Sequence, residues 1–294
     1  MHKLVLICLT VACIPSIAIA QSINKEIKSQ RGTTMLIGKI DRTGLQSDNY
    51  PWFSKNYDQY EPNNAITLNS AELNKYTIKL FLGTWCGDSK KEVPRLYKVL
   101  DAASFPMEQL SVVAVHVDSD TYKQSPNHEE VGLNIHRVPT IVFYKDGKEV
   151  NRIVEHPIES FEEDIQNIIT TNTYTSNYQL VAEVNDILTQ KGTKGLSKNT
   201  KKLLKKYTGK ASSMFELNTY GRVLYAKNQK EEAITVFKLN TKLFPDEPRT
   251  YMSLANTLGA NGKKNEALAV LKKAIKRHPN NQDLLENLKV VESN

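Results

Sequence analysis

Hydrophobic and polar positions follow a mixed strand and helix pattern between residues 76 and 170. Short continuous apolar runs at 77–82, 111–117 and 140–144 are rich in β-branched residues. Runs of this length and composition are typical of strands buried on both faces. A helical spacing over 89–103 separates the first two runs. The pattern predicts an α/β region with a buried sheet.

Turn and capping residues define the end of this region. Asp146-Gly147 supplies the left-handed residues of a hairpin turn, so 148–154 is predicted to return as a fourth strand. Ser160, with Glu163 three residues later, forms a capping box that predicts a terminal helix over 161–169. The predicted order is therefore β-α-β followed by β-β-α.

The chain after residue 177 is helical and contains a 34-residue repeat. The matched pairs are Gly221 and Ala255, Asn228 and Gly262, Ala233 and Ala267, Phe237 and Leu271, and Pro245 and Pro279. Small residues let paired helices approach closely, and the prolines end the second helices. Residues 214–294 resemble two tetratricopeptide repeats with a C-terminal capping helix. Residues 177–212 are expected to form a helical linker that caps the other end.

Residues 1–20 have the pattern of a cleaved secretory leader. A basic start precedes an apolar run, and Ala18-Ile19-Ala20 is a cleavage signature. An uncleaved anchor fits less well, because Pro15 interrupts a run already shorter than the ~20 apolar residues of a spanning helix. A lipid on Cys13 fits less well still, because Thr10 stands where such signals have an aliphatic residue. We expect cleavage after Ala20, a periplasmic or secreted protein, and no integral membrane span.

Residues 21–75 are expected to form an N-terminal extension that packs on the α/β region of 76–170. An edge strand is predicted at 35–40, and aromatic residues around 50–60 are expected in loops. The formal charge of +7 is mild for 294 residues, so it does not indicate a nucleic-acid partner. The acidic and histidine residues of 118–130 lack the spacing of metal ligands, so no metal or cofactor is expected.

The cysteine positions predict a single thiol after removal of the leader. Of the three cysteines, Cys8 and Cys13 leave with the leader, and Cys86 remains. Cys86 lies where the strand at 77–82 turns into a helix, in the sequence GTWCGDSKKEVP of 83–94. Unpaired backbone N–H groups and the helix dipole favour a thiolate at such a position, whereas the carboxylate of Asp88 opposes it.

This motif strongly resembles the thioredoxin family. The resemblance covers about residues 75–170 and rests on Trp85-Cys86-Gly87, Pro94 and Arg137-Val138-Pro139-Thr140. It implies a thioredoxin-like fold in which Cys86 is the nucleophile and Pro139 is a cis proline facing the thiol. Val138 would offer its backbone to a bound peptide, with Trp85 and Thr140 also at the substrate-binding edge.

Two departures from the family limit the chemistry. Ser89 replaces the second cysteine, and Leu80 replaces the buried aspartate that assists it. A mixed disulfide at Cys86 therefore needs an external thiol reductant for its release. The Ser89 hydroxyl is expected to hydrogen-bond the thiolate. Glu92 is similar to a glutamate near the active site of TlpA-like envelope oxidoreductases, which implies a proton carrier.

Two functions remain open at this level. One is thiol–disulfide exchange through Cys86, with the repeats holding a protein or peptide client. The alternative is a non-catalytic interaction protein built on a degenerate thioredoxin fold. The first helix of each repeat pair is expected to line a groove for an acidic or carboxylate-bearing peptide, unless the two repeats only brace the thioredoxin-like region. The predicted groove residues are Asn218, Arg222, Tyr225, Arg249, Met252 and Asn256.

Overall fold

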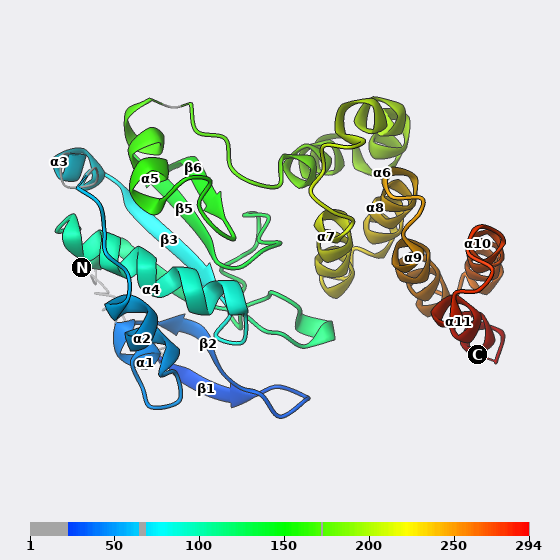
Figure 1. The fold of residues 1–294 in the computed structure, drawn as a ribbon, viewed down its shortest axis with the longest axis horizontal. Helices are drawn as coiled ribbons and strands as arrows, with labels where there is room; N and C mark the ends of the chain where they lie inside the picture. Colours follow the sequence, from blue (N-terminus) through cyan, green and yellow to red (C-terminus); the bar gives the residue numbers. More distant parts are fainter. Residues whose placement is uncertain (1–22, 65–68, 172, 294) are drawn as a thin grey trace, which may run out of the picture.

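The computed structural model describes residues 23–64, 69–171 and 173–293. The predicted leader lies outside the described residues. The described chain forms an α/β part up to residue 171 and an all-helical part from 179 onward, and the two parts lie side by side (Figure 1). Within these ranges, no helix combines the length and the apolar character that crossing a membrane requires.

The strands of the described residues form one mixed sheet in the order β1-β2-β4-β3-β5-β6. Only β3 and β4 are parallel among these neighbours. The strands are β1 (Lys25–Lys28), β2 (Thr34–Ile40), β3 (Thr77–Leu82), β4 (Leu110–Ala114), β5 (Thr140–Lys145) and β6 (Lys148–Val154). The predicted strands at 77–82 and 148–154 match at both ends, whereas β4 ends at Ala114 rather than at 117.

Helices cover one face of the sheet and share a single hydrophobic core with it. They are α1 (Arg42–Leu45), α2 (Trp52–Asp58), α3 (Ser70–Leu73), α4 (Gly87–Ala102) and α5 (Phe161–Thr170). The first helical turn of α5 is capped as predicted, because the Ser160 hydroxyl accepts a hydrogen bond from the Glu163 N–H at 3.2 Å. Burial of these apolar faces is the main stabilisation of the α/β part.

The opposite face of the sheet carries a smaller apolar cluster. Its buried members are Phe81, Val113, Val115, Ile135 and Val138. Side chains alternate between the two faces of a strand, so Phe81 of β3 points away from the helix-covered core while Leu80 and Leu82 point into it. Trp85 and Cys86 pack against the smaller cluster. The sheet therefore positions the predicted cysteine motif at the end of β3.

The N-terminal extension contributes both β1 and β2 to the sheet, whereas the sequence pattern predicts a single edge strand. The strand expected at an edge is β2, which lies between β1 and β4, so β1 occupies the edge. The aromatic residues expected in loops form α2 instead. Phe53 is fully buried, and its ring packs edge-on against Tyr97 of α4 with centroids 5.3 Å apart. This packing stabilises a helix whose aromatic residues have modest intrinsic propensity.

The helical part contains a helix pair at each of the two predicted repeats. The helices are α6 (Gln179–Tyr207), α7 (Phe215–Ala226), α8 (Lys230–Leu243), α9 (Pro248–Ala260), α10 (Lys264–Arg277) and α11 (Gln282–Ser293). α6 is the predicted linker and is kinked at Gly192, where φ is +60°. Gly221 lets α7 approach α8, because a Cβ there would lie 2.6 Å from the ring of Phe237.

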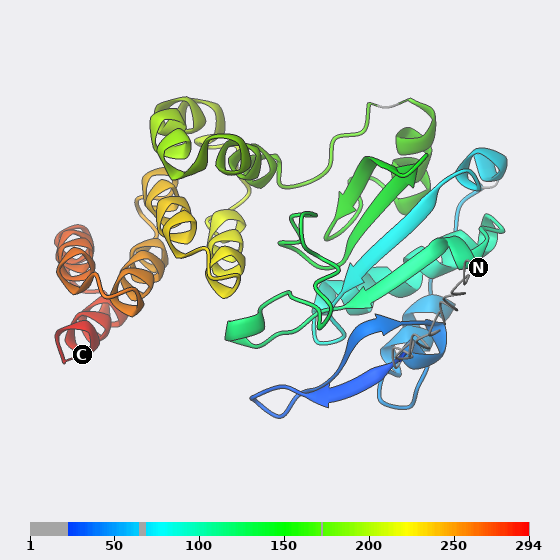
Figure 2. The same ribbon diagram turned by 180° about the vertical axis from the view of Figure 1, so that it is seen from behind.

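The two parts meet at the end of the sheet that carries Cys86. Both views place the short η3 turn (Ser119–Thr121) beside α7 (Figures 1 and 2). Arg137 donates a hydrogen bond to the Phe215 carbonyl at 3.0 Å. The ring of His136 packs edge-on against Tyr178 before α6 and against Tyr220 of α7. The first repeat helix is therefore a neighbour of the candidate site.

Candidate active site

A tight turn at the start of α4 presents the Cys86 thiol. Cys86 is the N-cap residue of α4 with an extended backbone, and its N–H donates to the Gly83 carbonyl at 2.8 Å. Glycine is needed at position 83, because a Cβ there would lie 2.5 Å from the Trp85 indole. The Cys86 residue is partly exposed. The sequence thus folds so that the sulfur is accessible at the first turn of the helix.

The thiol faces the loop before β5. The Val138–Pro139 peptide bond is cis, as the resemblance implies. The Cys86 thiol donates to the Val138 carbonyl at 3.3 Å, whereas the Asp88 carboxylate is farther away at 3.9 Å. The backbone of Val138 is therefore directly beside the sulfur. Its predicted contact with a bound peptide stays a prediction.

Trp85 is partly exposed beside the thiol, whereas Thr140 is buried. The Trp85 indole donates to the Val115 carbonyl at 2.8 Å, which fixes the ring as a wall beside the partly exposed sulfur. Thr140 is almost fully buried, and its hydroxyl donates to the Arg137 carbonyl at 2.7 Å. The Thr140 side chain braces the cis-proline loop from within, and its predicted place at the substrate-binding edge stays a prediction.

Neither Ser89 nor Glu92 makes a hydrogen bond to the Cys86 thiol in the described structure. Ser89 is fully buried, and its hydroxyl accepts from the Gly83 N–H at 3.2 Å instead of bonding the sulfur as predicted. The buried Glu92 carboxylate lies 2.9 Å from the Lys91 amine and 3.7 Å from the Arg95 guanidinium. These two cations neutralise the carboxylate. The contacts give no support to its predicted role as a proton carrier for Cys86.

A buried lysine beside the site was not predicted from the sequence. Lys123 is 4% exposed, and its amine donates to the His136 carbonyl at 2.9 Å. Burial lowers the pKa of Lys123 to about 7, and the charge of Arg137 acts in the same direction. A Cys86 thiolate acts in the opposite direction, so the amine lies within electrostatic range of the sulfur. No motif marks Lys123, because it lies in an irregular loop.

Arg137 joins the cis-proline loop to the repeats. One guanidinium nitrogen lies 2.8 Å from the Glu155 carboxylate, and the other terminal nitrogen donates to the Phe215 carbonyl of α7. The Arg137 guanidinium also lies over the ring of Tyr178, 4.8 Å from the ring centroid. Arg137 precedes the Val-Pro-Thr motif, which is the signal that could have identified it. Its contacts make the repeat domain part of the surroundings of Cys86.

The predicted groove of the repeats is interrupted at its first helix. The Arg222 guanidinium lies over the ring of Tyr122, 4.3 Å from the centroid, and so faces the thioredoxin-like part. Asn218 is buried, and Tyr225 packs partly against the helical core. The contact between Arg222 and Tyr122 joins segments a hundred residues apart, which the repeat pattern cannot show. The predicted role of these residues in lining a peptide groove stays a prediction.

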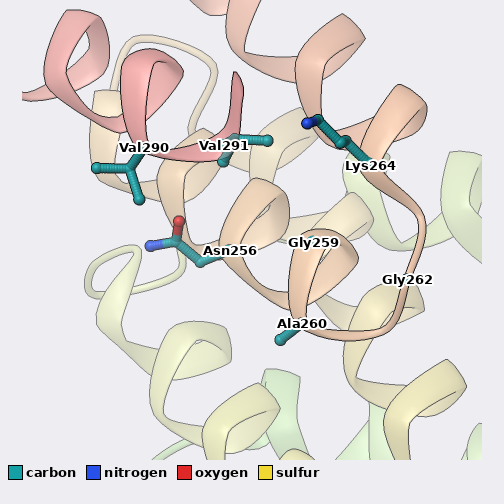
Figure 3. Close-up of a pocket in the computed structure, with 7 residues that line it drawn as sticks. All are labelled: Asn256, Gly259, Ala260, Gly262, Lys264, Val290 and Val291. Atoms are coloured by element: carbon teal, nitrogen blue, oxygen red, sulfur yellow. The ribbon is translucent and has the colours of Figure 1, made fainter. Parts of the chain in front are cut away.

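The remaining groove residues divide between two cavities. Arg249 and Met252 line one of about 490 Å³, together with residues of α7 and α11. Asn256 lines another of about 550 Å³, where Val290 and Val291 of α11 form the facing side (Figure 3). Residues of α11 line both cavities.

No group of three or more histidine, cysteine, aspartate and glutamate side chains in the described ranges is arranged to hold a metal ion. Two acidic residues of the loop before β5, Glu129 and Glu130, have protein partners. The Ser125 hydroxyl contacts both the Glu129 and the Glu130 carboxylates, and the Ser125 N–H donates to Glu130. These bonds order the loop that carries Tyr122 and Lys123.

Comparison with known proteins supports the assignment of both parts. The thioredoxin family model matches residues 66–170, and a tetratricopeptide repeat model matches 248–281. The chain is 34% identical over 74 residues to thioredoxin of Chlamydia trachomatis, covering 25% of this chain and 63% of that protein. It is 35% identical over 81 residues to thioredoxin-2 of Saccharomyces cerevisiae, covering 27% and 67%. The chain thus spans slightly less than two thirds of the first relative.

The matched segment contains the cysteine turn, the parallel β3–β4 pair and the cis proline described above. The second matched segment is the helix pair α9 and α10. Sequence similarity and geometry agree on both. The chain belongs to the thioredoxin family through residues 66–170, and it continues into a helical region with a tetratricopeptide repeat.

Proposed function

We propose that the protein carries out thiol–disulfide exchange through the single thiol of Cys86, with its repeat region contacting protein substrates. The observation that carries the proposal is the position of Cys86. Its sulfur is partly exposed at the N-cap of α4 and lies 3.3 Å from the carbonyl that precedes a cis proline. A cysteine that served only for packing would be buried, not partly exposed at the first turn of a helix.

The proposed reaction has three exchange steps. The Cys86 thiolate attacks one sulfur of a substrate disulfide, a new S–S bond forms, and the other substrate sulfur leaves as a thiolate. Ser89 stands at the position of a resolving thiol and cannot attack the mixed disulfide. An external thiol, either a small-molecule thiol or a reduced protein thiol, then attacks the Cys86 sulfur of that bond, so that the second substrate sulfur leaves as a thiolate and the external sulfur is bound to Cys86. Another external thiol attacks that bound external sulfur, which forms a disulfide between the two external thiols and regenerates the Cys86 thiolate.

Export through the leader at residues 1–20 is part of the same proposal. It places the thiol in an oxidising compartment, where substrate disulfides persist. N-terminal sequencing of the protein isolated from its host should then find a chain that begins at Gln21. An intact Met1 would contradict export by cleavage.

The proposal predicts that Cys86 in the folded chain reacts with iodoacetamide at neutral pH at least several-fold faster than in the same chain unfolded in urea. The unfolded chain supplies the rate of an ordinary thiol, with a pKa of ~8.5. Replacing Cys8 and Cys13 with serine leaves Cys86 as the single thiol, so alkylation can be followed by mass.

The matched control is the same chain with Cys86→Ser, which should take up no label. A folded chain that reacts more slowly than the unfolded one would favour the alternative, a protein that uses the thioredoxin fold only as a scaffold for binding.

A further inference from the structure

Arg222 of α7 is an exposed cation fixed beside the candidate site. Its guanidinium stacks 4.3 Å from the centroid of the Tyr122 ring, and that ring lies 6.2 Å from the ring of Trp85, the residue before Cys86. Stacking on an aromatic face holds a guanidinium in place without using its hydrogen-bond donors. The repeat domain therefore presents a cation with free donors two aromatic rings away from Cys86.

The electrostatic couplings agree with this position. Burial raises the pKa of Tyr122, the charge of Arg222 lowers it, and a Cys86 thiolate raises it. Arg222 and Cys86 thus act on the same phenol from nearby. The pKa of Lys123 also responds to both groups. A ligand that reaches the sulfur comes within range of the Arg222 charge.

The other cations of this region are already engaged. Arg137 pairs with Glu155 and donates to the Phe215 carbonyl, and Lys123 is buried with its amine on the His136 carbonyl. Arg222, in contrast, is exposed and has no carboxylate partner among the described residues. It is the cation at this site that remains able to pair with an incoming anion.

We propose that Arg222 is a specificity residue for Cys86 and recognises a carboxylate side chain close to the disulfide cysteine of an extended protein substrate. This inference rests on the proposed function. A guanidinium with free N–H groups matches a carboxylate in geometry as well as in charge. The first repeat then contributes to substrate choice at the thiol.

The test uses two synthetic peptides that each carry one cysteine activated by a thiopyridyl group. One peptide has aspartate and glutamate beside the cysteine, and the other has asparagine and glutamine. Release of thiopyridone measures attack by Cys86 in the chain with Cys8→Ser and Cys13→Ser. We expect the acidic peptide to react about fivefold faster, the size of a single exposed ion pair, with the preference reduced by salt.

Arg222→Gln should remove this preference and leave the rate with the amide peptide within about twofold. The matched control is Arg277→Gln, an equal charge change on α10, where Arg277 pairs with Asp246; it should keep the preference. An unchanged preference in Arg222→Gln would overturn the inference, as would an equal loss with both peptides, which would assign Arg222 to the domain junction. If neither peptide reacts faster with the folded chain than with the unfolded one, the proposed function fails instead.

Discussion

Replacing Ser89 with cysteine is expected to create an intramolecular disulfide with Cys86 and to raise the turnover of a generic disulfide substrate at least tenfold. Cys86 is the N-cap residue of α4, and Ser89 lies in its first turn on the buried side. A thiol at position 89 could attack the mixed disulfide internally, so release of the substrate would no longer wait for an external thiol, which would only have to reduce the new intramolecular disulfide. The small change from hydroxyl to thiol leaves the fold intact.

The measurement is insulin reduction with dithiothreitol, together with a thiol count after mild oxidation. The oxidised variant should contain no free thiol when Cys8 and Cys13 are serine. A control with Cys86→Ser and Ser89→Cys has one thiol again and should lose the gain. Two free thiols after oxidation would contradict the geometry argued for this turn. The gain should stay below that of a natural dithiol enzyme, because the buried Leu80 supplies no acid to the second cysteine.

Acidification is expected to destabilise the protein through His136, by about 3 kcal/mol between pH 6.5 and pH 4. Burial lowers the pKa of His136 to about 3, and the charges of Lys123, Arg137 and Arg152 act in the same direction. Above pH 6.5 the imidazole is neutral in the folded and unfolded states. Below that pH only the unfolded chain takes up the proton, so stability falls until the pH reaches the folded pKa. The His136 ring packs against Tyr178 and Tyr220, so its protonation should also weaken the contact between the thioredoxin-like part and the helical part.

Urea unfolding at a series of pH values measures this slope, about 1.4 kcal/mol per pH unit for one group. His136→Phe keeps an aromatic ring between the two tyrosines and removes the titration, so its slope over the same range should be shallower. His156→Gln removes an exposed imidazole and should leave the slope as in the wild type. Equal slopes in the wild type and His136→Phe would contradict this account.

The fold was predictable where the chain carries local, repeated signals. The strands at 77–82 and 148–154 are bounded by turn residues and matched the structure, and the 34-residue period placed α7 to α10. α2 was missed because its aromatic residues are stabilised by packing on α4 rather than by helical propensity. The edge position of β1 was missed because strand order depends on pairing between distant segments.

The site was predictable to the extent that its motif is contiguous. The sequence around Cys86 and the Val138-Pro139 pair identified the thiol and the cis proline that faces it. Tyr122 and Lys123 lie in an irregular loop without periodicity, and only the folded chain brings them to the sulfur. The contact of Arg222 with Tyr122 was not predictable, because the repeat pattern describes helices within an array and not what packs against the array.

The central claim is that Cys86 is a single exchanging thiol that depends on an external thiol for release. The direct measurement is reaction of the chain carrying Cys8→Ser and Cys13→Ser with glutathione disulfide, followed by mass spectrometry and peptide mapping. We predict one mixed disulfide per chain, on Cys86, formed faster in the folded than in the unfolded protein and stable until reduced glutathione is added. A folded chain that forms no adduct, or an adduct that disappears without added thiol, would contradict the claim.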